Sequence, residues 1–224
     1  MKTLKTCGLV FISSLLCLMS SISPAQDPAA DFMNAVAQGD LKAVKKGIAE
    51  GIDVNLVDSE RMTPLMMAIY GDQSEIVDLL ILNGADVNLK TKKGSNALNV
   101  AASMGNKEFC GLLLQNGADL ELPDNEGKTP LMNAVYNKKI EIAEFLVEQG
   151  ANVNAMEPEG WSALMFATMG GAAEMVKMLL EAGADVNSRT NDGETPLQRA
   201  MKIEEAGMGD YSEIIRLLKD AGAE

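Results

Sequence analysis

The sequence has 224 residues, a formal net charge of −13 and no histidine. The lack of imidazole argues against most hydrolase triads and histidine-ligated zinc sites, and the acidic charge argues against binding to nucleic acid or to anionic membrane surfaces. Aromatic residues make up only 4% of the chain. The core must therefore be built from aliphatic residues and methionine, which fits small helices better than a β-sandwich.

Residues 1–25 are expected to be a secretory signal peptide and not part of the fold. The segment begins with the basic sequence MKTLKT, continues with an uncharged and mostly apolar stretch over 8–19, and then has small residues at Ser23 and Ala25. This order is typical of an export signal that is cleaved after Ala25. The apolar stretch is shorter than the roughly 20 residues that span a bilayer, and an uncleaved anchor is the alternative.

Export would place the remaining chain in the periplasm of a Gram-negative bacterium or outside the cell. Cleavage removes Lys2 and Lys5 but no acidic residue, which leaves 17 basic and 32 acidic residues and a net charge of −15. Such a charge favours a basic partner, although it also serves solubility. Cleavage also removes Cys7 and Cys17. With Cys110 as the single remaining cysteine, stability must come from packing and not from disulfides.

The chain after residue 30 repeats with a period of 33 residues. A glycine, a leucine and an alanine each recur at this interval and in one register, which does not arise by chance. A unit of this length is too small to bury its apolar side alone, so neighbouring units must stack. The three ladders consist of Gly51, Gly84, Gly117, Gly150 and Gly183, of Leu65, Leu98, Leu131, Leu164 and Leu197, and of Ala68, Ala101, Ala134, Ala167 and Ala200.

Each unit is predicted to form two short helices followed by a turn-rich loop. Thr63 and Pro64 indicate a helix start, because threonine caps the free N–H groups and proline is tolerated in the first turn. A second helix is predicted near 75–82, and Gly84 ends it because glycine readily adopts the left-handed conformation found there. Residues 85–95 then form a hairpin loop. The recurring hexapeptide NGADVN therefore marks the end of a helix pair and the start of the next loop.

The sequence resembles the ankyrin repeat family. The motifs TPLMMA at Thr63, TPLMNA at Thr129 and TPLQRA at Thr195 are close to the family signature T-P-L-H-x-A, and the period is that of the family. The resemblance implies an all-α repeat solenoid in which stacked helix-turn-helix ankyrin repeats are joined by β-hairpin loops. The expected domain, 26–224, contains N-terminal capping helices over 31–52 and full repeats at about 53–85, 86–118, 119–151, 152–184 and 185–224.

The chain departs from the family pattern in three ways. Arg61 replaces the glycine of the hairpin in the first full repeat. The last repeat has six additional residues within 202–211, which either lengthen its first helix or enlarge the loop between its helices. The histidine of the signature is replaced in every repeat, by Met66, Asn99, Met132, Met165 and Gln198.

No catalytic, cofactor-binding or metal-binding residue is expected. Cys110 is in register with apolar, inward positions of the other second helices, which predicts a buried and inert thiol. The fifteen methionines could be interpreted as Cu(I) ligands. However, packed helices lie about 8–10 Å apart, so the methionines of the signature position are better explained as core residues. The sequence DNEGKT at 124–129 lacks the closing glutamate of a calcium-binding loop.

Surface recognition remains, and the family resemblance implies where it would occur. Ankyrin repeat proteins bind along a concave face formed by the hairpin tips and the exposed side of the first helices. Trp161, the only tryptophan, falls at a tip position, and exposed aromatic residues are typical interface anchors. The alternative is that Trp161 folds back over the neighbouring hairpin. The residues expected on the concave face are Trp161, Tyr136, Met156, Met169, Tyr70, Met104, Lys128 and Arg189.

Two functions are compatible with this sequence. The first is a non-enzymatic protein–protein interaction module of the bacterial cell envelope, which binds a partner protein through its concave face. The second is an immunity or accessory protein that inhibits or stabilises one periplasmic enzyme or toxin, for which a single tight and salt-sensitive partner is expected. An effector that acts outside the cell is a third, weaker hypothesis. We expect a monomer without cofactor, because both end units carry polar outer faces.

Overall fold

The computed structural model describes residues 27–224, and the predicted signal peptide lies outside the described residues. The described chain forms twelve helices, confirming the predicted all-α repeat solenoid. The helices are α1 Pro28–Gln38, α2 Leu41–Ala49, α3 Pro64–Tyr70, α4 Ser74–Leu82, α5 Ala97–Met104, α6 Lys107–Gln115, α7 Pro130–Tyr136, α8 Ile140–Glu148, α9 Ala163–Met169, α10 Ala173–Glu181, α11 Pro196–Glu205 and α12 Ser212–Asp220.

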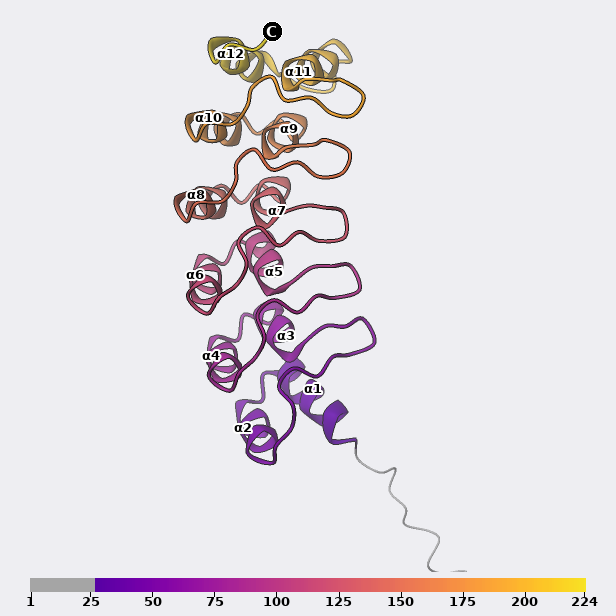
Figure 1. Cartoon of the computed structure of the whole chain (residues 1–224), viewed down its shortest axis with the longest axis vertical. Helices are drawn as coiled ribbons and strands as arrows, with labels where there is room; N and C mark the ends of the chain where they lie inside the picture. Colours follow the sequence, from indigo (N-terminus) through magenta and orange to yellow (C-terminus); the bar gives the residue numbers. More distant parts are fainter. Residues whose placement is uncertain (1–26) are drawn as a thin grey trace, which may run out of the picture.

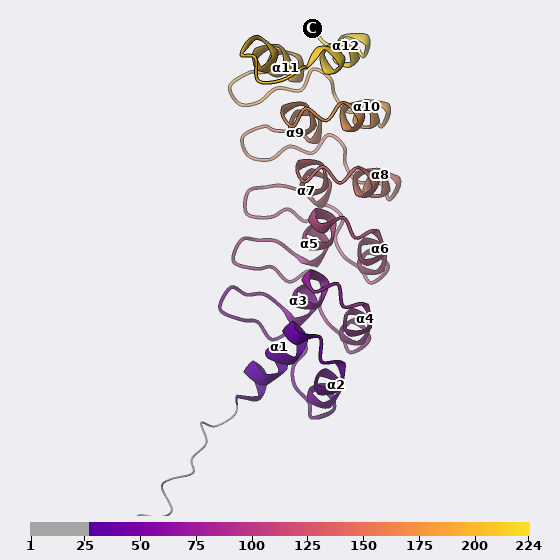
Figure 2. The ribbon, with the colours of Figure 1, turned by 180° about the vertical axis from the view of Figure 1, so that it is seen from behind.

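The helices stand in two columns that run the length of the molecule (Figure 1). The first helices of the pairs, α1 to α11 with odd numbers, form one column, and the second helices form the other. Five loops project from the column of first helices, and the gentle curve of the molecule keeps their tips on its inner side, as the reverse view also shows (Figures 1 and 2). We name them loop 1 (53–63), loop 2 (86–96), loop 3 (119–129), loop 4 (152–162) and loop 5 (185–195).

The first helix of each full repeat begins at a polar side chain that caps it. The Thr63 hydroxyl accepts a hydrogen bond from the backbone N–H of Met66 at 3.2 Å, and Thr129 does the same for Met132 at 3.3 Å. Asn96, Ser162 and Thr195 take the corresponding role in the remaining repeats. All five caps are buried, so each one satisfies an otherwise unpaired N–H group at a place that water does not reach.

The leucine and alanine ladders form the core between the two columns. Every member of both ladders is buried, and the alanines are at most 1% exposed. α5 packs on α3 and α7, and α7 packs on α9, so the alanines allow successive first helices to approach closely. Met66, Met132 and Met165 are also buried in this core, as the packing interpretation predicts. Gln198 is exposed, and no helix pair among residues 27–224 packs on the outer side of α11 and α12.

The glycines that end the second helices have the predicted left-handed backbone, with φ of +85° at Gly84. Arg61 has the same type of conformation, with φ of +61°, at the position where the other four loops have glycine. A left-handed conformation costs an L-residue about 1 kcal/mol or more, so loop 1 holds a strained residue at its bend.

The structure differs from the sequence expectation at three places. α1 begins at Pro28 and is capped by Asp27, before the expected start at residue 31. The loops contain no strand within residues 27–224. Loop 4 has an isolated antiparallel bridge between Met156 and Ser162, and each loop is closed by a backbone hydrogen bond such as that from Thr91 to Ser95.

The third difference concerns the six additional residues of the last repeat. They both lengthen its first helix and enlarge the loop between its helices, which the sequence left as alternatives. α11 has ten residues where α7 and α9 have seven, and the remainder enlarges the loop before α12. Tyr211, in this loop, is buried and donates a hydrogen bond to the Met169 carbonyl at 2.9 Å. The enlarged loop is therefore fastened to the preceding repeat.

Asparagine side chains join successive repeats at the base of the loops. The Asn88 amide donates to the Gly117 carbonyl at 2.9 Å, and its oxygen accepts from the Asp119 N–H at 2.9 Å. Asn55, Asn154 and Asn187 make the same pair of bonds, each to the next helix pair and loop or, for Asn187, to the C-terminus. At the equivalent position of loop 3, the Glu121 carboxylate accepts a hydrogen bond from the Asn152 N–H at 2.7 Å, but this side chain has no N–H group to donate. The last residue of the recurring hexapeptide thus fixes one repeat to the next.

Candidate functional site

The residues predicted for the concave face lie on the loops and on the loop side of the first helices, but they are not all exposed. Met104 is partly buried, and Lys128 keeps only 16% of its side chain exposed. Arg189 is exposed and donates to the Gly193 carbonyl at 2.9 Å. Of the predicted residues, the large apolar side chains that are exposed are Tyr70 (52%), Tyr136 (52%), Met156 (49%) and Met169 (38%).

Trp161, Phe166 and Tyr136 form an aromatic cluster, to which Lys128 and Arg199 add their cationic groups. Trp161 is partly buried, so it is less open to solvent than a tip position suggests. Its ring stacks on Phe166 with 5.5 Å between ring centroids, and the Arg199 guanidinium lies 4.9 Å from the indole on the side of the last repeat. Tyr136 meets Phe166 edge-on at 5.9 Å. The prediction that Trp161 faces solvent therefore holds only for the part of the indole that these neighbours leave uncovered. Its role as a binding anchor stays a prediction.

Phe166 and Arg199 are members of the cluster that the sequence analysis missed. They occupy the same repeat position, 33 residues apart, where the other repeats have Met67, Val100 and Asn133. The Phe166 ring lies against Trp161 in the loop of its own repeat, and the Arg199 guanidinium lies against Trp161 in the loop of the repeat before it. A comparison of this position along the repeats could have found them, because it brings one aromatic and one cationic residue next to the only tryptophan.

The two cations of the cluster are already paired. The Lys128 ammonium lies 4.4 Å from the Tyr136 ring centroid and 2.6 Å from the Glu126 carboxylate. The hydrogen bond from Lys128 holds the pKa of Glu126 below its usual value. Arg199 is paired with Glu194, which also receives the Lys202 ammonium at 2.9 Å. Lys128 therefore contributes to the shape of the cluster more than it offers a free positive charge.

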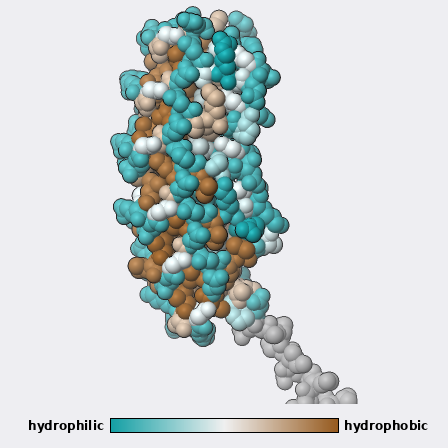
Figure 3. Space-filling model, viewed as in Figure 1, coloured by the Kyte–Doolittle hydropathy of each residue, from teal (hydrophilic) through white to brown (hydrophobic). Residues whose placement is uncertain are grey.

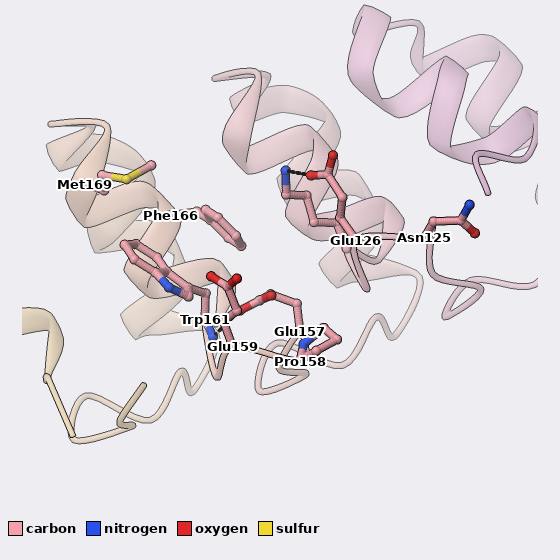
Figure 4. A pocket seen from close by; sticks show the side chains of 9 residues that line it. Asn125, Glu126, Glu157, Pro158, Glu159, Trp161, Phe166 and Met169 are labelled. Carbon is pink, nitrogen blue, oxygen red and sulfur yellow. Dashed lines mark hydrogen bonds and ion pairs between the residues drawn. The ribbon is translucent and has the colours of Figure 1, made fainter. Parts of the chain in front are cut away.

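A groove of about 460 Å³ lies beside this cluster, between loops 3 and 4 (Figure 4). Trp161, Phe166 and Met169 form its apolar side, and Glu126, Glu157 and Glu159 bring carboxylates to it. Its remaining lining residues are Asn125, Lys128 and Pro158. Glu157 is oriented by the backbone, since its carboxylate accepts a hydrogen bond from the Trp161 N–H at 2.8 Å. The groove combines an apolar wall with an excess of negative charge.

The other predicted residues are not brought to this groove. Tyr70 lines a separate hollow two repeats away with Glu60, Met62 and Lys93. Met104, Met156 and Arg189 line neither of these two hollows. The loop side of the molecule is predominantly hydrophilic, whereas hydrophobic surface shows over the helices (Figure 3). The aromatic cluster and its groove are thus a local feature of an otherwise polar face.

Within residues 27–224 no group of three or more histidine, cysteine, aspartate or glutamate residues is placed to hold a metal ion. No helix of the same range has the length and apolar content needed to cross a membrane.

Cys110 is fully buried, and burial raises its pKa to about 12. We expect its thiol to be almost inert in the folded protein, because only the thiolate reacts and a rise from the ordinary value near 9 lowers the thiolate fraction about 10³-fold. Labelling of residues 26–224 with Ellman's reagent at pH 8 should be at least that much slower in buffer than in 6 M guanidinium chloride. Fast labelling of the folded chain would contradict the buried position. Because the range contains no other cysteine, the signal is unambiguous.

The chain matches the family model described as "Ankyrin repeats (3 copies)" over residues 32–124, 67–157 and 150–224. Among solved structures it is similar to an ankyrin repeat domain from Acinetobacter baumannii AYE, with 31% sequence identity and a TM-score of 0.77, covering 86% of this chain and 98% of that one. No curated protein matches the sequence. The family match extends over nearly all of the described residues and agrees with the stacked helix pairs, the capped first helices and the projecting loops. The chain therefore belongs to the ankyrin repeat family.

Proposed function

We propose that this protein is a non-enzymatic interaction module of the bacterial cell envelope, and that it binds a partner protein through its concave face. Ankyrin repeats are protein-interaction modules. The observation that carries the proposal is the aromatic cluster beside an open groove, with Tyr136, Met156 and Met169 exposed on the same face. Exposed aromatic and methionine side chains of this kind are enriched among the residues that dominate binding energy.

The composition supports a binding role over catalysis. The sequence has no histidine, which removes the commonest general base. Cys110, the one thiol after the leader, is buried with a raised pKa and so lacks the properties of a nucleophile. At the groove, the hydrogen bond from Lys128 lowers the pKa of the Glu126 carboxyl. A general acid would need a raised one.

The cell-envelope location rests on the leader-like sequence of residues 1–25. A cleaved export signal would deliver residues 26–224 to the periplasm or the outside of the cell. The described chain needs no disulfide, because its stability comes from stacked repeats. Expression with the leader, followed by fractionation and mass spectrometry of the mature N-terminus, tests this part. A chain that starts at Gln26 in the periplasmic fraction supports it, and an intact leader in the cytoplasm contradicts it.

The second candidate, an immunity or accessory protein for one periplasmic enzyme or toxin, is favoured by the charge. A net charge of −15 without the leader would accelerate association with a basic partner at low salt. Capture at 20 mM and 500 mM NaCl separates the two candidates. A single partner whose association rate falls steeply with salt supports the accessory role, whereas several salt-insensitive partners support a general scaffold.

A double variant tests the binding face. Trp161→Ala with Tyr136→Ala removes two anchors, and we expect it to weaken partner capture from periplasmic extract at least 100-fold, as loss of two residues worth about 2 kcal/mol each implies. Helical content should not change, since both residues lie at helix ends or in a loop.

Leu82→Ala is the matched control for this variant. Leu82 is 83% exposed and lies on a second helix, away from the loops. Its replacement should leave capture unchanged. Undiminished capture by the double variant would exclude these anchors.

A further inference from the structure

The tips of neighbouring loops are joined by backbone hydrogen bonds, with one exception. The Lys92 N–H donates to the Glu60 carbonyl at 2.9 Å, and the Asn191 N–H donates to the Glu159 carbonyl at 2.9 Å. The Asn125 N–H makes the corresponding bond between loops 2 and 3 at 3.0 Å. Between loops 3 and 4 the donor position is Pro158, which has no N–H group. This bond is therefore missing at the junction of loops 3 and 4.

Two side-chain bonds are missing at the same junction. Asn125 and Asn191 donate their side-chain amides to the preceding loop at 2.7 and 2.8 Å, and Pro158 has no such group. Glu121, as described above, cannot donate to the carbonyl of Gly150 as the asparagines do at the other junctions. We name the junction between loop 3 and loop 4 the seam. It lacks three hydrogen bonds that other junctions have, and within residues 27–224 the Glu126 carbonyl oxygen accepts none.

The groove beside the aromatic cluster lies at the seam, and its charge is one-sided. Glu126 is neutralised by Lys128, but Glu157 and Glu159 form no ion pair with any described residue. Glu159 is exposed and Glu157 is partly buried, and the two stand on either side of Pro158 (Figure 4). A cation placed here would meet two carboxylates without displacing another cation. Its hydrocarbon stem could cover the uncovered edge of Trp161 and the exposed Met169 side chain.

We propose that the seam is the docking site for an extended segment of the partner protein that carries an arginine or lysine. The basic side chain lies between Glu157 and Glu159 with its stem against Trp161 and Met169, and a backbone N–H of the segment donates to the Glu126 carbonyl. The proposal rests on the proposed function and names the chemistry of its partner. A second copy of this chain is a poor occupant, because its own charge is strongly negative and like charges repel.

The test uses two short peptides and the folded chain of residues 26–224. Acetyl-Ala-Arg-Ala-amide is titrated into ¹⁵N-labelled protein, and its neutral isostere with citrulline in place of arginine serves as the reference. We expect amide shifts confined to 125–128 and 157–161, with a millimolar Kd for the arginine peptide and at least ten-fold weaker binding of the citrulline peptide. Equal binding of both peptides, or shifts centred elsewhere, would overturn the proposal.

Two variants locate the contacts. The double variant Glu157→Gln, Glu159→Gln should bind the arginine peptide about ten-fold more weakly. The control variant Glu75→Gln, Glu141→Gln changes the net charge equally at exposed positions of second helices and should have little effect on binding. If both variants weakened binding equally, long-range electrostatics would explain the result and the specific site would be overturned. Pro158→Asn introduces the residue that loops 3 and 5 have at this position, and its backbone N–H should donate a hydrogen bond to the Glu126 carbonyl. The variant should have a higher melting temperature and a lower affinity for the arginine peptide. Unchanged peptide affinity would overturn the proposed backbone contact.

The outcomes separate this inference from the function on which it rests. If Pro158→Asn and the Glu157→Gln, Glu159→Gln pair capture the partner as well as the wild type while Trp161→Ala with Tyr136→Ala does not, the concave face binds but the seam is not the docking site. If none of these variants changes capture, the proposed function fails as well. Concentration-dependent shifts at 125–128 without peptide would assign the groove to a second copy and overturn the proposal.

Discussion

Leu131→Ala is expected to lower the free energy of unfolding by about 3–5 kcal/mol, as for large-to-small substitutions in well-packed cores. Leu131 is 1% exposed and lies in α7, which packs on α5 on one side and α9 on the other. Helices on both sides limit how far the structure can collapse into the cavity, so most of the lost packing is not recovered. Urea unfolding of residues 26–224, followed by circular dichroism at 222 nm, measures the change.

Leu197→Ala is the matched control, because Leu197 has the same position in the last repeat. It is 7% exposed, and in the described part of the chain no repeat stacks on its outer side. We expect a cost of about 2 kcal/mol or less, with fraying that is confined to α11 and α12. In a solenoid the free energy of unfolding is approximately the sum of the intrinsic stabilities of the repeats and the energies of the interfaces between neighbouring repeats. An equal cost at both positions would contradict the view that these interfaces supply most of the stability.

Asn88→Ala is expected to destabilise the protein by about 1–3 kcal/mol, because it removes two hydrogen bonds and leaves their partners unpaired. The partners are the Gly117 carbonyl at the end of the same repeat and the Asp119 N–H at the start of the next repeat. The bond to Asp119 thus joins two neighbouring repeats. The substitution should therefore reduce the cooperativity of unfolding as well as the midpoint, which a broadened urea transition would show.

Glu121→Asn is the reciprocal change. It restores the amide donor that Asn55, Asn88, Asn154 and Asn187 supply at the equivalent positions, and we expect a gain of about 0.5–1.5 kcal/mol, the usual net value of one hydrogen bond. The two variants should thus shift the urea midpoint in opposite directions. If Asn88→Ala were neutral, the asparagine bonds would not connect the repeats energetically, and a loss of stability in Glu121→Asn would lead to the same conclusion.

The fold could be predicted from the sequence because the repeats place equivalent residues in equivalent environments. Thr63 and Thr129 cap first helices, and Gly84 adopts the left-handed conformation, for local reasons that act within a few residues. Leu131 and Ala134 recur because each repeat needs the same face to pack on the next. Local signals and the stacking requirement agree at these positions, so the repeat pattern was sufficient to predict the fold.

The asparagine bonds were not predicted, although their residues were part of the motif. Asn88 and Asn154 follow a helix-ending glycine, and a polar residue in a loop needs no tertiary explanation when one repeat is considered alone. Their partners lie 29 and 31 residues further along the chain. Only the stacked arrangement brings these groups together.

The candidate site was predicted in part for a related reason. Tyr136 and Met169 are exposed where the family pattern places them. The environment of Trp161, however, depends on Phe166 in its own repeat and on Arg199 in the next. The period shows that Phe166 and Arg199 occupy equivalent positions, but their contacts with Trp161 depend on which residues fill those positions in these two repeats and not on the repeat pattern itself. The missing bonds at Pro158 became meaningful only by comparison with the other loop junctions.

The most direct test of the central claim is a hydrogen-exchange footprint of residues 26–224 with the captured partner bound. The account predicts slower exchange in loops 3 and 4 and in the adjoining ends of α7 and α9, with α6, α8 and α10 unchanged. Protection of the second helices with unchanged loops would contradict it, because the partner would then bind the face opposite to the aromatic cluster.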